Sequence, residues 1–176
     1  MPHQPQGAAF DIVLLFHVGS VAVGLASMLA GAATAARLQR ALSRPARVPG
    51  TVLRYFRPGV NWAARTVYAI PVSGAALLAM SQGAYTWRDG WVMAGLGAFV
   101  AVALLAEIVL WPVERRLQSA LAAHTADTAD TADTADPAPG GRWEAPARRE
   151  ARLMVRSSSL ALLLILAGSA LMVAQP

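Results

Sequence analysis

The sequence predicts an all-α integral membrane protein built as a four-helix bundle, and three observations carry this prediction. Of the 176 residues, 56% are hydrophobic and only 14% are charged, whereas charged residues make up about 25% of ordinary soluble domains. The apolar residues gather in four long runs, and the arginines gather in the segments between these runs. A soluble globule of this size needs more charge to cover its surface, so a soluble enzyme domain is disfavoured.

The first predicted span covers residues 8–36 and is interrupted only by Asp11 and His17 among strongly polar residues. At 1.5 Å per residue it exceeds the hydrocarbon core of about 30 Å. The tail before it carries no arginine or lysine, and its apolar run is too long for the apolar region of a signal peptide. We therefore expect a helix that stays in the mature protein.

The second span is predicted at 63–87, the third at 91–113 and the fourth at 157–174. Pro71 is expected to kink the second span because it removes one backbone donor. Only three residues separate Trp87 from Trp91. This spacing predicts a tight antiparallel hairpin at 88–90, with Gly90 available for the turn.

Tryptophans test the boundaries of these spans. Trp62 and Trp87 bracket the second span, and Trp91 and Trp111 bracket the third. Amphipathic rings prefer the interface between membrane and water. We therefore expect these four rings to mark interfaces.

The arginines predict the orientation. Seven lie between the first span and the inner start of the second, which includes Arg65, seven lie between the third and fourth, and Arg88 alone lies on the other side. By the positive-inside rule both arginine-rich segments face the cytoplasm. The expected location is a bacterial inner membrane, with both termini on the periplasmic or extracellular side.

The two inner segments differ in character. The first, residues 37–65, has no acidic residue, and its arginines either act only as this topology signal or also attract anionic lipid headgroups. The second contains four copies of Thr-Ala-Asp at 125–136, and residues 124–142 are predicted to form a disordered linker. Neither segment contains a nucleic-acid-binding module, so no nucleic-acid partner is expected.

One stripe of the first span is small and polar. It consists of residues at spacings of three and four, namely His17, Ser20, Gly24, Ser27 and Gly31. Small residues let helices approach closely, so this stripe should face the other helices. The simplest role for His17 is then an imidazole hydrogen-bonded to a neighbouring hydroxyl or carbonyl.

A metal or cofactor site is the alternative for His17. With both termini outside, His17, Met80, Met93 and Met172 all fall in the outer third of the bilayer. Imidazole and thioether groups are suitable ligands for copper(I) or haem iron. The hypothesis requires these four side chains to face one another.

Glu107 is the one acidic residue deep in a predicted span, near its inner end. A carboxylate there is costly unless it is paired or reaches water. Arg65 is the expected partner in a structural ion pair. The alternative is a small proton-coupled transporter that uses Glu107.

Catalytic residues are not predicted. The chain contains no cysteine and no lysine, which excludes thiolate chemistry, disulfides and Schiff bases. We also find no Gly-rich phosphate loop, no G-x-S-x-G and no H-E-x-x-H motif.

Several segments together resemble an uncharacterised bacterial family of predicted integral membrane proteins with four helices. They are Leu15-Phe16-His17, Pro71 with Gly74, Leu110-Trp111-Pro112-Val113, and the terminal Leu171-Met172-Val173-Ala174-Gln175-Pro176. The family is more distantly similar to copper-resistance protein D and to HemJ-type proteins of haem biosynthesis. That similarity implies a role for His17 in metal or haem binding.

The expected function is a structural or accessory membrane component, with the lipid bilayer and a homodimer or larger membrane complex as partners. A haem- or copper-binding protein using His17 and a transporter using Glu107 stay open as alternatives.

Overall fold

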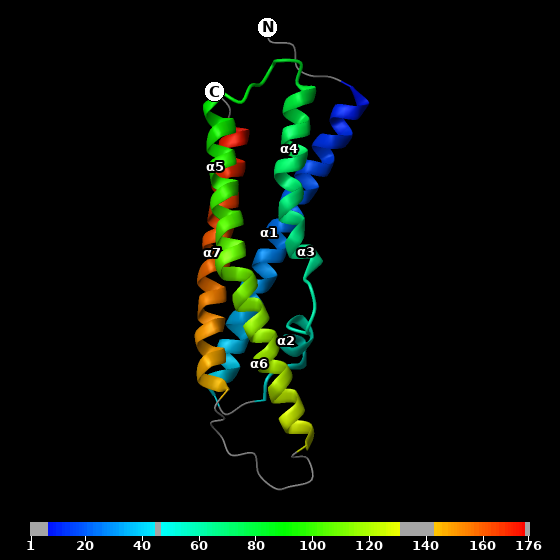
Figure 1. Cartoon of the computed structure of the whole chain (residues 1–176). Coiled ribbons are helices and arrows are strands. Elements are labelled where there is room, and N and C mark those ends of the chain that lie inside the picture. The colour runs from blue at the N-terminus through cyan, green and yellow to red at the C-terminus, as the bar shows by residue number, and fades with distance from the viewer. Residues whose placement is uncertain (1–6, 45–46, 131–142, 175–176) are drawn as a thin grey trace. The chain divides into compact units, whose positions relative to one another are not determined.

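The computed structural model describes residues 7–44, 47–130 and 143–174, and these ranges contain helices and no strand (Figure 1). The elements are α1 (Ala8–Leu42), α2 (Gly50–Tyr55), α3 (Trp62–Arg65), the 3-10 turn η1 (Thr66–Tyr68), α4 (Ala69–Met80), α5 (Gly90–Leu105), the π-helical turn η2 (Ala106–Leu110), α6 (Trp111–Asp130) and α7 (Glu144–Val173). Four helical stretches are long and apolar enough to cross a membrane, namely Ala8–Leu42, Trp62–Met80, Gly90–Ala126 and Glu144–Val173. The prediction of a helical chain with four candidate spans is confirmed.

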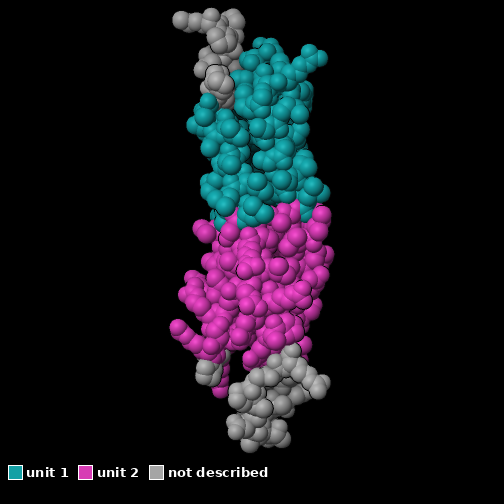
Figure 2. Space-filling model, turned by 90° about the vertical axis from the view of Figure 1, so that its left-hand side faces the viewer, with its two compact units in different colours: residues 1–28, 61–104, 160–176 teal, residues 29–60, 105–159 magenta. Residues whose placement is uncertain are grey.

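The chain divides into two compact units (Figure 2). Unit 1 comprises residues 1–28, 61–104 and 160–176, and unit 2 comprises residues 29–60 and 105–159. Three long helical stretches contribute residues to both units: α1, α7, and the stretch formed by α5, η2 and α6.

Unit 1 is held together by close approach at small residues. A Cβ placed on Gly24 of α1 would lie 3.8 Å from Cδ1 of Ile70, and a Cβ on Gly168 of α7 would lie 3.5 Å from Cβ of Ala98. Small residues permit this approach and increase van der Waals contact between apolar helices. Within unit 1, α1 therefore packs on α4, and α7 packs on α5.

Unit 2 has an apolar core of its own. Short and long helices alike bury apolar residues at helical spacing, and α6 also buries the polar Glu114 and Gln118. The largest fully buried side chains of the unit are Phe56, Leu38, Leu110, Leu117, Val52 and Val113. At Gly31 of α1, an added Cβ would lie 3.1 Å from the hydroxyl of Tyr55 and 3.3 Å from Cε of Met154. The bare backbone of Gly31 is therefore a contact point for both α2 and α7.

Three helices are longer than the sequence predicts. The first predicted span ends at 36 but α1 continues to Leu42, the third ends at 113 but α6 continues to Asp130, and the fourth starts at 157 but α7 starts at Glu144. In each extension the apolar residues follow a helical period, and one of these stripes is Ala147, Ala151 and Met154, all buried. The predicted boundaries mark where the apolar runs end, whereas the helices continue as amphipathic helices.

The second predicted span is shorter than expected, and the tight hairpin at 88–90 is wrong. Helix α4 ends at Met80, and residues 81–89 connect it to α5. Ser81 stops the helix because its hydroxyl accepts from the backbone N–H of Tyr85 at 3.3 Å, and Gln82 and Gly83 follow with φ of 52° and 86°. Gly90 is the first residue of α5 rather than a turn residue.

Two prolines lie beside the irregular turns. Pro71 has no N–H to donate to the carbonyl of Val67, and the chain there forms the 3-10 turn η1. Pro112 has the same effect on the carbonyl of Ile108, and η2 precedes it, with the N–H of Trp111 bonded to the carbonyl of Ala106. The predicted disturbance at Pro71 is therefore found just before the proline.

The tryptophans meet the prediction in part. The side chains of Trp62 and Trp87 are exposed, and Trp91 packs edge-on against Tyr85 at a centroid distance of 5.4 Å. Trp111 is only 3% exposed, within a helical stretch that continues past it. Trp111 therefore does not mark the end of a helix, and its place at a membrane interface stays a prediction.

The predicted linker at 124–142 starts later than expected. Helix α6 continues to Asp130, and Thr125 donates from Oγ1 to the carbonyl of Leu121 at 2.8 Å, which favours helix over an irregular start. His124 stacks on Trp143 with ring centroids 4.1 Å apart. Residues 131–142 lie outside the described residues.

The contact at Gly31 predicts a position-specific loss of stability. We expect Gly31→Val to lower the free energy of unfolding by about 1–3 kcal/mol, because the new side chain overlaps Tyr55 and Met154. Gly19→Val in the same helix is the matched control, since nothing lies within 4 Å of a Cβ there. Thermal unfolding of the purified proteins measures both, and equal midpoints for the two variants would contradict this packing.

Candidate functional site

The most buried polar side chain pair of unit 1 joins α1 to α4. His17 is 8% exposed, and its Nδ1 lies 2.9 Å from Oγ of Ser73. Ser73 is also buried, and its hydroxyl donates to the carbonyl of Ala69 at 2.7 Å. This confirms the simplest role predicted for His17, an imidazole hydrogen-bonded to a hydroxyl of a neighbouring helix.

The hydrogen bonds of Ser73 assign the tautomer of His17. A serine hydroxyl has one proton, and here that proton goes to the helix backbone. When the hydroxyl donates to this carbonyl, Oγ accepts from His17, and the arrangement places a proton on Nδ1. In the uncharged ring Nε2 then carries a lone pair and is free to accept a hydrogen bond or bind a metal.

The imidazole of His17 lies against α4 at Gly74. A Cβ on Gly74 would lie 3.4 Å from Cε1 and 3.8 Å from Nδ1 of His17. A Cβ at Gly74 would thus meet the ring at ordinary van der Waals distance, so the ring packs closely against α4 at this position. The inward stripe of α1 is confirmed as well, since Ser20, Gly24 and Gly31 are buried together with His17.

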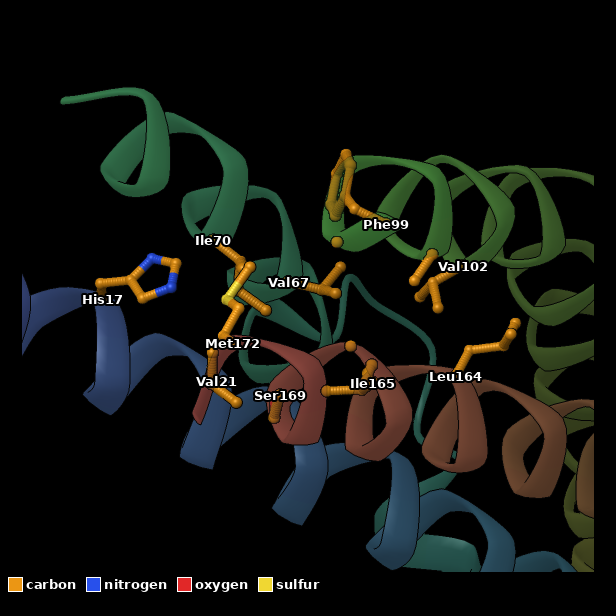
Figure 3. A pocket seen from close by; sticks show the side chains of 13 residues that line it. His17, Val21, Val67, Ile70, Phe99, Val102, Leu164, Ile165, Ser169 and Met172 are labelled. Carbon is orange, nitrogen blue, oxygen red and sulfur yellow. The ribbon is translucent and has the colours of Figure 1, made fainter. Parts of the chain in front are cut away.

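A cavity of about 50 Å³ lies beside His17, entirely within unit 1 (Figure 3). Its walls are mostly aliphatic, and its polar or polarizable lining groups are His17, Ser169 and Met172. In Figure 3 the imidazole points toward Ile70 and Met172, and Leu164 lies at the other end. The cavity is large enough for water-sized ligands.

The structure brings together two of the four predicted metal ligands. His17 and Met172 both line the cavity, whereas Met80 and Met93 do not. Met93 is 54% exposed on α5. The predicted set of four is therefore wrong as a set, because residues at the same depth on different helices need not face the same way.

Gly95 makes room for Met172. A Cβ on Gly95 would lie only 2.8 Å from Cε of Met172, so the thioether end packs directly on the α5 backbone. Two residues that line the cavity, His17 and Met172, thus carry an imidazole and a thioether group. These donors suit copper(I), a soft ion, better than harder metals.

A haem does not fit this cavity. Cofactor-sized ligands occupy pockets of about 300–1,000 Å³, and the cavity has about 50 Å³. The described residues also contain no group of three or more histidine and carboxylate side chains that could hold a metal ion. Among the predicted cofactors, a copper ion is the one whose donors the cavity contains.

Sequence reasoning missed the partners of His17. Ser73 and Gly74 draw attention only as neighbours of Pro71, and Ser169 draws none. A serine facing inward in an apolar helix is a usable signal, because its hydroxyl needs a partner there. The sequence does not show which helix supplies that partner.

Glu107 and Arg65 fall in different units. Glu107 lies on η2 in unit 2, exposed and outside the lining of the cavity, and Arg65 ends α3 in unit 1. Their ion pair stays a prediction, and no structural observation favours a transporter role for Glu107. The ion pair seen within unit 2 joins Arg116 to Glu150 at 3.3 Å.

Comparison with known proteins adds no relative. No protein-family model, no curated protein and no solved structure matches this chain. The resemblance to copper-resistance and HemJ-type proteins therefore stays an expectation. Function has to be argued from the arrangement of the residues.

The assigned tautomer gives a spectroscopic prediction. In ¹⁵N-histidine spectra of the purified protein, we expect the uncharged ring of His17 to carry its proton on Nδ1, and Ser73→Ala to remove that preference because the acceptor is lost. Ser20→Ala is the matched control, since the hydroxyl of Ser20 bonds only to the carbonyl of Phe16. A proton on Nε2 in the unmutated protein would contradict the assignment.

Proposed function

We propose that this chain is an accessory component of a bacterial inner membrane. In this proposal the four apolar helical stretches form a bundle in the bilayer, the two arginine-rich segments between them face the cytoplasm, and both termini face outward. The chain acts by packing and binding rather than by catalysis. A second copy or a larger membrane complex is its expected partner.

The observation that carries the proposal is the opposite distribution of exposed apolar residues and arginines. Eighteen of the twenty-one large hydrophobic side chains exposed among the described residues belong to unit 1. Thirteen of the fifteen arginines belong to unit 2. Exposed apolar surface of this extent favours contact with lipid, and arginine-rich segments stay on the cytoplasmic side.

The polar groups support an accessory role because they hydrogen-bond one helix to another. His17 is bound to α4 through Ser73. Arg148 of α7 donates to the carbonyl of Leu42, the last residue of α1. A cation at that place satisfies a free carbonyl and the negative end of the helix dipole. Both groups connect helices to one another.

The topology is testable because the chain contains no cysteine. Single substitutions at exposed positions report on three places: Ala84→Cys between α4 and α5, Ala122→Cys on α6, and Gly97→Cys on the outer face of α5. With a membrane-impermeant maleimide on intact cells, we expect labelling at position 84 only. Position 122 should react after permeabilisation, and position 97 should stay unlabelled because lipid covers it.

Two outcomes would contradict this topology. Labelling at position 97 in intact cells would show that this face of unit 1 is not in the bilayer. Labelling at 122 instead of 84 would reverse the orientation. Normal membrane insertion of each variant, followed by immunoblotting of the membrane fraction, is the control.

We infer copper(I) binding as a second candidate function, supported by one observation. The free Nε2 of His17 and the thioether of Met172 belong to residues that line the same cavity. A bound copper(I) ion would be held by these two soft donors in an apolar setting that excludes water. The role of the chain would then be to hold the ion.

Copper(I) binding has a matched set of variants. In anaerobic titrations of the detergent-purified protein against a colorimetric copper(I) chelator, we expect affinity to fall at least about tenfold in His17→Ala and Met172→Leu, since each removes a ligand. Met93→Leu should bind like the unmutated protein because Met93 does not line the cavity. Equal affinity in all variants, or no binding by the unmutated protein, would exclude this site.

A further inference from the structure

We propose that Arg37 and Arg40 of α1 bind the phosphate group of an anionic phospholipid in the cytoplasmic leaflet. This inference rests on the topology proposed above. Its ligand class is a phosphodiester headgroup without a balancing cation, such as that of phosphatidylglycerol.

Two contacts within unit 2 place the residues along α1 and α7. Near one end Gly31 of α1 meets Met154 of α7, and near the other the carbonyl of Leu42 accepts from Arg148. The order of these contacts makes the two helices antiparallel. Arg37 and Arg40 lie between the two contacts on α1, and Arg149 and Arg152 lie between them on α7.

The arginines occupy the outer faces of these helices. On α1 the exposed residues follow the helical repeat from Leu29 through Ala33 to Arg37, Arg40 and Arg44. The inner face of α1 buries Ala35, Leu38 and Leu42. The outer face of α1 therefore changes from apolar to cationic along one continuous stripe.

The segment of chain that carries these two arginines is strongly cationic. Residues 29–60 contain six arginines and no acidic residue. Among the described residues no acidic partner is recorded for Arg37 or Arg40, and the Nε of Arg40 reaches only its own helix, at the carbonyl of Ala36. An uncompensated pair of guanidinium groups favours an anion with several oxygen acceptors.

Helix direction selects α1 over α7 as the lipid-binding helix. Side chains on a helix lean toward its N-terminus. In the proposed topology the N-terminus of α1 points into the membrane, so Arg37 and Arg40 lean toward the lipid-facing Leu29. The N-terminus of α7 points into the cytoplasm, so Arg149 and Arg152 lean away from the bilayer.

The spacing supplies a matched control. Arg37 and Arg40 follow the exposed Leu29 by eight and eleven residues, and Arg152 and Arg149 precede the exposed Leu160 by the same numbers. The two pairs therefore have equal charge and equal distance from an exposed apolar residue of their own helix. They differ in the direction of their side chains.

Native mass spectrometry of the full chain in detergent tests the proposal, with phosphatidylglycerol and phosphatidylcholine as probes. From the usual strength of arginine contacts to anionic lipid we expect R37Q/R40Q to weaken phosphatidylglycerol binding about 30-fold. R149Q/R152Q should change it less than about twofold, and R37K/R40K should keep most of it because the charge remains. Circular dichroism checks that each variant is folded.

Three results would overturn the proposal. They are equal binding of the two lipids, equal losses in the two glutamine double variants, and displacement of the lipid by inorganic phosphate at similar concentration, which would indicate a site for a free anion. Cysteine labelling separates this inference from the topology. An expected labelling pattern without lipid preference removes only the inference. A reversed pattern with lipid preference removes the topology and the assignment to the cytoplasmic leaflet, but keeps phosphatidylglycerol binding by Arg37 and Arg40.

Discussion

The rest of this structure depends on the length of three helical stretches. Helix α1 alone has 35 residues, and at 1.5 Å per residue it is about 52 Å long, against a hydrocarbon core of about 30 Å. A helix of this length meets two solvents if one part of it crosses a membrane. Its exposed face therefore has to change from apolar to charged along one continuous backbone, while its inner face buries His17, Ser20 and Thr34 among small and apolar residues.

The apolar runs predict which residues could cross a membrane but not where the helices end. Hydropathy places the four candidate stretches well, because each is a long run with few charges. It misses the ends of α1, α6 and α7, because hydropathy alone predicts a loop for an arginine-rich stretch. The helical period of the buried residues there, such as Ala147 and Ala151, indicates a helix instead. It also misses the end of α4, which depends on the hydrogen bonds of Ser81 and the left-handed backbone at Gln82 and Gly83.

The candidate site shows the same division between local and tertiary information. The inward direction of His17 follows from the spacing of small residues on α1, and the need for a hydroxyl or carbonyl partner follows from chemistry. Ser73 becomes that partner because Gly74 lets α4 approach the ring. The methionines show what the sequence cannot provide, since the rotation of each helix about its axis decides that Met172 lines the cavity and Met93 faces outward.

The ring stack between His124 and Trp143 bears on how this gene can change. The stack joins His124 to Trp143, and these two residues flank the whole Thr-Ala-Asp repeat at 125–136. A change in copy number therefore alters the length of the chain between them. Loop-closure entropy depends on the logarithm of length, and one added triplet costs roughly 0.1 kcal/mol. Tandem repeats gain and lose copies by slippage during replication. An added or lost triplet at this place keeps His124 and Trp143 as the two residues that flank the repeat.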